Sequence, residues 1–196
     1  MSGKQQRLIL ASSSKYRQSL LARLGLSFES IAPEIDEKIL SNETPEELVQ
    51  RLAMSKAKII SDQYHDAMVI GSDQVAVFDN RIIGKPGTHD KAFQQLKEFS
   101  GKPVIFLTAV ALVSHASQIK KFGTSVVTVE FKSLSDKQIQ KYLLSDQPYD
   151  CAGSFKVESL GVSLFKYVHS NDPTSLEGLP LILVCNLLGQ AGVDII

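Results

Sequence analysis

Asp73 is the residue of this sequence whose surroundings most strongly suggest chemistry. It stands in the segment 69–75, which is apolar at both ends and interrupted by Gly71-Ser72-Asp73-Gln74. Because burying an unpaired carboxylate is costly, Asp73 requires a metal, a basic partner or a dense set of hydrogen bonds. Gly71 would let another group approach the backbone closely. The structural alternative is an aspartate that caps a bulge at a strand end.

Two lysines stand where an anion would explain them. Leu48, Leu52 and Ile60 form an apolar stripe at four-residue spacing, and Lys56 occupies the position between Leu52 and Ile60. An ammonium group on a core-facing stripe is rare unless it is paired or reaches solvent along its stem, and both explanations stay open. Lys85 lies in Gly84-Lys85-Pro86, but the spacing of a Walker phosphate loop is absent, so a Walker-type NTPase is rejected.

A serine-rich turn and an acidic segment complete the candidate set. Serines 12–14 follow a short apolar run and open a helical pattern that carries Arg17. Backbone N–H groups and hydroxyls at a helix start favour anions such as phosphate. Glu34, Asp36 and Glu37 supply the oxygens that Mg²⁺ prefers, although taken alone they are better explained as a solvated acidic turn. Together with Asp73 and the cations, they form a set for phosphoryl chemistry.

Alternating strands and helices would position these residues. Strands are expected at residues 7–11, 68–77, 81–83, 104–114, 120–132 and around 162–168. Helices are expected after the serines up to Gly25, from Thr44 to about residue 61, from about 90 to 99, after Ser135 and after Pro180. Because a hairpin interrupts the alternation, we predict an α/β fold with a mixed central sheet flanked by helices. Residues 1–196 would form a single domain with two lobes around a central cleft.

Composition narrows the function classes. The chain of 196 residues carries 21 basic and 21 acidic side chains and is 43% hydrophobic. A formal charge of zero disfavours nucleic acid as a partner, while a local basic pocket for a small anion remains open. The two cysteines, Cys151 and Cys185, fit a reducing compartment. The apolar runs are shorter than the ~18 residues of a membrane span, so we expect a soluble, cytoplasmic protein.

Eight short segments occur in the order found in Maf proteins, and the sequence resembles that family over nearly its whole length. Each segment is weak by itself, but the combination is highly specific. The segments are LILASSSKYR from residue 8, PEIDE from 33, KAK from 56, GSDQ from 71, GKP from 84, SG from 100, TAVAL from 108 and GLPL from 178.

The resemblance implies an activity, a cofactor and an assembly. Maf proteins are nucleotide pyrophosphatases with a fold similar to that of the inosine-triphosphate pyrophosphatases, typically dependent on Mg²⁺ or Mn²⁺ and often dimeric. The implied reaction is hydrolysis of a nucleoside triphosphate to the monophosphate and pyrophosphate, and the implied assembly is a homodimer. Maf proteins have also been linked to inhibition of septum formation, so a nucleotide-binding regulator without turnover is the alternative of another class.

The resemblance also implies roles for individual residues. Asp73 would be the general base, or the carboxylate that positions the attacking water. Asp36 would hold the divalent metal, in a role that Asp73 or Glu37 could share. The phosphate contacts would come from Ser12, Arg17, Lys56 and Lys85.

The substrate base is expected to be read by Tyr16, Gln74 and Glu158. Many Maf proteins have Pro-Arg-Arg after the serines, whereas this chain has Lys15-Tyr16-Arg17, which suggests a base contact at position 16. The branch that acts on dTTP and UTP carries Gly-Ala-Asp-Thr around the catalytic aspartate, where this chain has Ser-Asp-Gln. This pattern, with Glu158, resembles the 7-methyl-GTP pyrophosphatase branch.

The chemistry of methylated guanine supports this choice. The 7-methylguanine ring is cationic, so the face of Tyr16 could stack on it with a cation–π energy of about 0.5–2 kcal/mol. The carboxylate of Glu158 could accept hydrogen bonds from the guanine N1–H and exocyclic amine. The structural alternatives are a core aromatic for Tyr16 and a surface charge for Glu158. A pyrophosphatase for pyrimidine triphosphates, or one of broad specificity, is the competing enzymatic interpretation.

Overall fold

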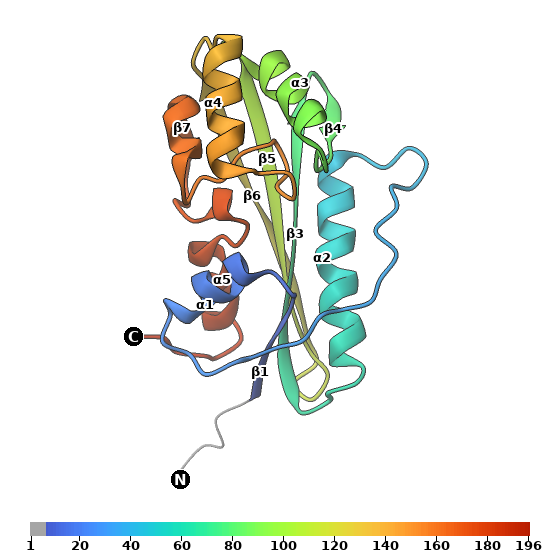
Figure 1. Cartoon of the computed structure of the whole chain (residues 1–196). Helices are drawn as coiled ribbons and strands as arrows, with labels where there is room; N and C mark the ends of the chain where they lie inside the picture. Colours follow the sequence, from blue (N-terminus) through green and yellow to red (C-terminus); the bar gives the residue numbers. More distant parts are fainter. Residues whose placement is uncertain (1–6) are drawn as a thin grey trace.

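A seven-stranded sheet forms the centre of the protein, as a computed structural model of residues 7–196 shows (Figure 1). The strand order is β2-β1-β3-β5-β6-β7, and β4 pairs with β3 off this path. The strands are β1 (Arg7–Ala11), β2 (Glu29–Ser30), β3 (Ala67–Phe78), β4 (Arg81–Ile83), β5 (Pro103–Ser114), β6 (Ile119–Phe131) and β7 (Phe165–Ser170).

The sheet is mixed, as the hairpin signal predicted. Strand β1 runs parallel to β2 and β3, whereas the neighbours from β3 through β5 and β6 to β7 are antiparallel. Strand β2 was not expected, because its two residues are exposed and carry no apolar pattern. The last strand begins at Phe165 and not near 162, because residues 160–164 form a 3₁₀ helix, η1 (Leu160–Leu164).

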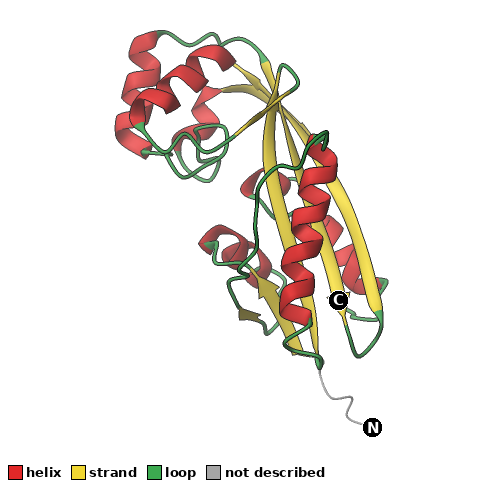
Figure 2. Ribbon diagram, turned by 90° about the vertical axis from the view of Figure 1, so that its right-hand side faces the viewer, coloured by secondary structure: helices red, strands yellow, loops and turns green. Residues whose placement is uncertain are grey.

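Helices cover the sheet on both faces and at one end (Figures 1 and 2). Helix α2 lies on one face, α1 and α5 lie on the other, and α3 and α4 pack together at the far end of the long strands. The helices are α1 (Lys15–Ala22), α2 (Pro45–Ser61), α3 (His89–Phe99), α4 (Asp136–Asp146), α5 (Leu181–Gly189) and the 3₁₀ turn η2 (Ser175–Glu177). None of the helices described is long and apolar enough to cross a membrane.

Local sequence signals account for the helix boundaries. Thr44 caps α2 through a complete capping box: its hydroxyl accepts from the backbone N–H of Glu47 (3.2 Å), and the Glu47 carboxylate accepts from the N–H of Thr44 (2.9 Å). Ser135 caps α4 with the same arrangement through Gln138. Such boxes satisfy backbone donors that have no partner inside the helix, and both predicted helix starts are confirmed.

Strand alternation divides the core between the two faces of the sheet. Leu8 and Leu10 of β1 pack with α1 and α5, whereas Ile9 and Ala11 pack against α2. Successive side chains of a strand point to opposite faces. Residues that neighbour each other on β3 therefore point to different sides of the molecule, which matters for Asp73 and Gln74.

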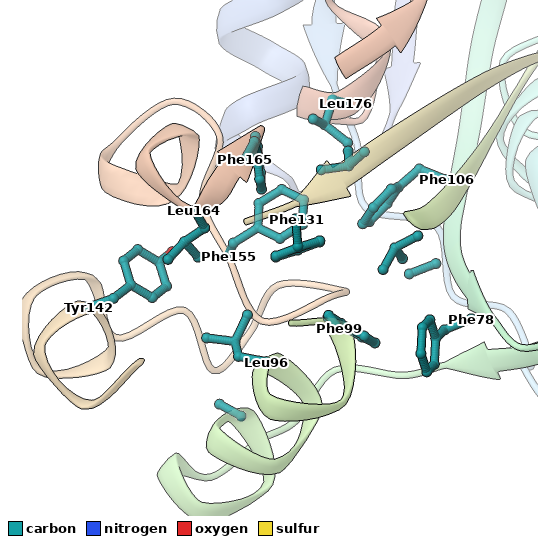
Figure 3. Packing of buried hydrophobic residues seen from close by; sticks show 14 of the residues in the cluster. Phe78, Leu96, Phe99, Phe106, Phe131, Tyr142, Phe155, Leu164, Phe165 and Leu176 are labelled. Atoms are coloured by element: carbon teal, nitrogen blue, oxygen red, sulfur yellow. The ribbon is translucent and has the colours of Figure 1, made fainter. Parts of the chain in front are cut away.

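A separate aromatic cluster fills the end of the molecule that carries α3 and α4 (Figure 3). The rings of Phe106 and Phe155 meet edge-on with centroids 5.3 Å apart, and Phe131 contacts Phe155 at 5.9 Å. Offset and edge-on arrangements of this kind are the favoured aromatic geometries. This packing holds the loop around Phe155 against the sheet and so gives one wall of the site a rigid support.

Candidate active site

The site begins where α2 lies directly on β3, opposite Gly71. A Cβ atom at Gly71 would stand only 2.2 Å from the carbonyl oxygen of Ala53 and 2.7 Å from the backbone nitrogen of Ala57. Only a residue without a side chain allows this approach, as the sequence suggested. The close contact brings the middle of α2 against the strand segment that carries Asp73.

Lys56 of α2 and Asp73 of β3 form a buried ion pair. The Lys56 Nζ atom lies 2.6 Å from Asp73 Oδ1 and 2.6 Å from Glu37 Oε1, so one ammonium bridges two carboxylates. Lys56 is 7% exposed and Asp73 8%. The pairing explains why an ammonium occupies a core-facing stripe and how the strand carboxylate is compensated.

Glu37 reaches this site from an irregular segment that precedes α2. Its hydrogen bond to Lys56 lowers the pKa of the Glu37 carboxyl, with smaller contributions from the charges of Lys56, Lys85 and Arg17. Arg51 of α2 holds the same segment in place. Its Nε and Nη2 atoms lie 2.5 and 2.8 Å from the two carboxylate oxygens of Glu43. Its Nη2 also donates a hydrogen bond to the carbonyl of Lys38 (3.0 Å). Glu37 is therefore presented by a segment that α2 itself anchors.

Asp36, the predicted metal residue, lies outside this arrangement. Its side chain is 70% exposed, and its carboxylate accepts from the backbone N–H of Lys38 (3.0 Å). Neighbouring side chains of an extended segment point in opposite directions, so the chain that directs Glu37 inward directs Asp36 outward. The metal role of Asp36 stays a prediction, while the geometry places Glu37 with Asp73.

The serine-rich turn lies between β1 and α1. Ser12 is buried, and its Oγ accepts from the backbone N–H of Ser14 (3.1 Å), while Ser14 caps α1 by accepting from the N–H of Arg17 (3.4 Å). The Arg17 Nε donates to the carbonyl of Gly178 (2.8 Å). The guanidinium is thus held in place by the C-terminal part of the chain, and burial lowers its pKa.

These residues line one cleft of about 790 Å³. This volume lies within the ~300–1,000 Å³ typical of small-molecule sites. The cleft brings together all five residues predicted for catalysis and phosphate binding, Ser12, Arg17, Lys56, Asp73 and Lys85. Two of the predicted specificity residues, Tyr16 and Gln74, line it as well, and so do Glu37 and Lys15.

A second cavity of about 180 Å³ opens beside the cleft and shares Tyr16, Arg17, Gln74 and Lys85 with it. It unites the three predicted specificity residues, Tyr16, Gln74 and Glu158. Gln74 points to the face opposite Asp73, where its Nε2 donates to Thr108 Oγ1 (2.8 Å) and to the carbonyl of Ser175 (2.9 Å). Phe106 and Phe155 of the aromatic cluster form part of its wall. We call this space the base cavity.

The donor set fits a magnesium or manganese ion only in part. Within residues 7–196, no group of three or more His, Cys, Asp or Glu side chains is arranged to hold a metal. Glu37 and Asp73 nevertheless present two carboxylates to a single cation, the ammonium of Lys56. Mg²⁺ is usually held by one or two carboxylates together with substrate phosphates, and these two residues could supply that share.

The chain belongs to the Maf family. The family model described as "Maf-like protein" matches residues 7–191, which is nearly all of the part that the structure describes. This assignment agrees with the α/β fold, with the cleft and with the order of the segments along the sequence.

Relatives named 7-methyl-GTP pyrophosphatase match over nearly their full length. The protein from Pseudomonas aeruginosa is 51% identical, covering 96% of this chain and 98% of its own. That from Nitrosococcus oceani is 49% identical, covering 96% and 95%, and that from Albidiferax ferrireducens is 46% identical, covering 98% and 96%. The Staphylococcus aureus Ham1 protein shares the fold, with a TM-score of 0.54 and 12% identity over 94% of this chain and 99% of its own.

Three features of the site escaped the sequence reasoning. Lys15 is exposed at the first turn of α1, yet it lines the cleft, and its place directly after the serines was a usable signal. Asp150 lines both the cleft and the base cavity. Glu177 lines the base cavity from η2. The last two lie in or beside irregular loops, where no periodic pattern indicates the direction of a side chain.

Proposed function

We propose that this chain is a nucleoside-triphosphate pyrophosphatase that hydrolyses 7-methyl-GTP to 7-methyl-GMP and pyrophosphate. One observation carries the proposal: a cleft with a buried carboxylate and several cations opens into a smaller cavity lined by Tyr16, Gln74 and Glu158. The cleft suits a triphosphate and the cavity suits a base. The names of the relatives and the family assignment support the same activity.

The chain's own side chains suggest how the reaction would proceed. Arg17 and Lys85 line both spaces and would hold the phosphate chain at the junction. The Asp73 carboxylate would orient a water and accept its proton while the water oxygen bonds to the α-phosphorus. The bond from that phosphorus to the bridging oxygen then breaks, and pyrophosphate leaves. Positioning and charge stabilisation are the main catalytic contributions in such phosphoryl chemistry.

A divalent cation, Mg²⁺ or Mn²⁺, would be held by Glu37 and Asp73. When bound, it would supply positive charge to the phosphate chain. Asp36 remains a second candidate on the resemblance, although its side chain points to solvent. A direct comparison of manganese affinity in Glu37→Gln and Asp36→Asn, measured by calorimetry, separates the two. We expect the larger loss in Glu37→Gln, and an equal or larger loss in Asp36→Asn would return the role to Asp36.

Pyrophosphate release from a nucleotide panel tests the proposal. We expect 7-methyl-GTP to be turned over much faster than GTP, UTP or dTTP, in the presence of Mg²⁺ or Mn²⁺. Asp73→Asn should lower kcat by about a hundredfold or more, as expected when a general base is lost. Asp79→Asn is a matched control, because Asp79 lies in the exposed turn after the same strand.

The panel also separates the alternatives. Faster turnover of UTP or dTTP would indicate a pyrimidine-directed enzyme, and similar rates for all nucleotides would indicate a broad-specificity one. Nucleotide binding without pyrophosphate release by the intact protein would favour a regulator. Glu158→Gln should weaken the use of methylated guanine specifically, and an unchanged substrate ratio would refute that role.

The remaining features are proposals of organisation. We propose one domain with two lobes on either side of the cleft, extending from residue 1, although residues 1–6 lie outside the described part. A cytoplasmic site of action is supported by the two free cysteines. A homodimer is supported by apolar side chains exposed on the sheet face beside α2, namely Ile105, Phe122 and Val126. Light scattering of the purified chain tests the dimer, and a monomeric mass at micromolar concentration would contradict it.

A further inference from the structure

We propose that the base cavity recognises the positive charge of the substrate base, and that Asp150 is a specificity-determining residue for this recognition. The inference rests on the proposed function, since it concerns how 7-methyl-GTP is distinguished from GTP. It widens the expected substrate class to purine triphosphates whose ring is made cationic by alkylation at N7. It also separates two properties of the methyl group, its shape and the charge that it creates.

When a triphosphate is bound, the base cavity would carry more negative than positive charge. Three carboxylates line the cavity: Asp150, Glu158 and Glu177. The cationic side chains that line it are Arg17 and Lys85, and both also line the triphosphate cleft. A bound triphosphate would neutralise these two cations. The carboxylates would then face the base without equivalent compensation.

Asp150 is the carboxylate best placed to act on the base. It lines the cleft as well as the base cavity, and so stands where the two spaces meet. Within the described chain no ion pair involves Asp150 or Glu158, whereas Glu177 pairs with Arg23 (3.1 Å). Among residues 7–196, the side chain of Asp150 accepts one hydrogen bond, from Sγ of the neighbouring Cys151 (3.5 Å). Its negative charge is therefore available to a ligand.

Neighbouring groups already respond to this negative charge. Burial raises the pKa of the Cys151 thiol to about 12, and the charge of Asp150 is the next cause. The pKa of Tyr16 is also raised, first by burial and then by Cys151, Glu158 and Asp150. The part of these shifts that comes from the acidic neighbours disfavours a new anion here, and the same negative charges would attract a cation.

A neutral base would gain less from this arrangement than a cationic one. Guanine can donate hydrogen bonds to Glu158, but it supplies no positive charge, so Asp150 would gain no cationic partner when guanine binds. The 7-methylguanine ring supplies one positive charge at the same position, and the Tyr16 face adds a cation–π contribution. Specificity then arises from an attraction that the cationic base receives and the neutral base does not.

The decisive probe is 7-methyl-7-deaza-GTP, which keeps the methyl group but has an uncharged ring. We expect kcat/KM for this analogue to fall to the level of GTP, far below that for 7-methyl-GTP. If the analogue is used as well as 7-methyl-GTP, the cavity recognises shape and the inference is wrong, while the proposed function stands. If the wild-type chain prefers UTP or dTTP over 7-methyl-GTP, the proposed function fails, and the inference fails with it.

Variants at Asp150 test the residue itself. Asp150→Asn should lower the ratio of kcat/KM for 7-methyl-GTP over GTP by about two- to fivefold, the scale of one exposed ion pair. Asp150→Glu keeps the charge and should restore most of the ratio. Asp194→Asn, an exposed acid that lines neither space, is the matched control. An unchanged ratio in correctly folded Asp150→Asn would overturn the assignment.

Discussion

Replacing Lys56 by methionine would test the central charge arrangement of the site. The substitution removes the ammonium and keeps an unbranched side chain of similar length. In the wild-type chain this ammonium lies 2.6 Å from oxygens of both Asp73 and Glu37. Its loss leaves the buried carboxylate of Asp73 without its cationic partner, whereas Glu37, with a side chain 60% exposed, can turn to solvent.

The structure sets the size of the effect. Removing one partner of a buried ion pair costs about 3–5 kcal/mol, because the remaining charge is left uncompensated. The ion pair between Lys56 and the more exposed Glu37 contributes at most about 1 kcal/mol to the free energy of unfolding. Burial of the apolar methionine side chain offsets part of the loss. We therefore expect a decrease of about 2–4 kcal/mol in the free energy of unfolding. Lys58→Met removes an exposed pair with Asp62 and should cost less than about 0.5 kcal/mol.

Urea unfolding followed by circular dichroism measures both variants, with and without Mn²⁺. Because the metal is proposed to bind the same two carboxylates as Lys56, Mn²⁺ should stabilise Lys56→Met more than it stabilises the wild type. A ligand at a hundred times its Kd adds about 2.7 kcal/mol. Equal losses in Lys56→Met and Lys58→Met would refute the buried-pair reasoning. Equal stabilisation of wild type and Lys56→Met by Mn²⁺ would show that the metal and the ammonium do not share a position.

Three further predictions follow from packing and ionisation. Gly71→Ala should cost at least about 2 kcal/mol in urea unfolding, because its Cβ would lie 2.2 Å from the Ala53 carbonyl, whereas Gly189→Ala, with open space around it, should not. Cys151, whose pKa is about 12, should react with iodoacetamide at pH 8.5 about a thousandfold more slowly than an ordinary thiol, and a comparable rate would contradict its burial. The pKa of the Glu37 carboxyl is lowered from 4.5 in the folded protein, so its stabilising effect is present above pH 4.5 and is lost as the pH falls through the lowered pKa. The free energies of unfolding of wild type and Glu37→Gln should therefore converge in acid, as urea unfolding at several pH values would show.

Several parts of the site could be read from local patterns. The capping box at Thr44 predicted where α2 begins, and the four-residue steps of its apolar stripe placed Lys56 on the buried side. The apolar run around Asp73 predicted a strand, and Gly71 predicted a close approach. These inferences succeed because helix and strand periods, caps and glycine conformations are determined by neighbouring residues.

Irregular segments were the least predictable part. Nothing in the sequence Glu34-Ile35-Asp36-Glu37 shows which acid turns inward, since an extended chain can present either side. The choice of Glu37 depends on the anchoring of this segment by Arg51 and Glu43 and on the position of Lys56. The position of Asp150 beside the base cavity likewise depends on a loop whose neighbouring residues, Tyr149 and Ala152, pack against the aromatic cluster.

The sequence by itself determined the main helices and the long strands, the mixed sheet and the residue types of a phosphoryl site, but not β2 or the 3₁₀ helix η1. Only the tertiary structure decided that residues 37, 56 and 73 form one bridge, and that Asp150, Glu158 and Glu177 surround one cavity. A sequence pattern predicts structure only over a few neighbouring residues. These groups are far apart in the sequence and are brought together because α2 packs on β3 and because the C-terminal part of the chain contacts α1. Whether distant acidic and basic side chains compensate each other can therefore be seen only in the folded chain, because it depends on which of them lie close together.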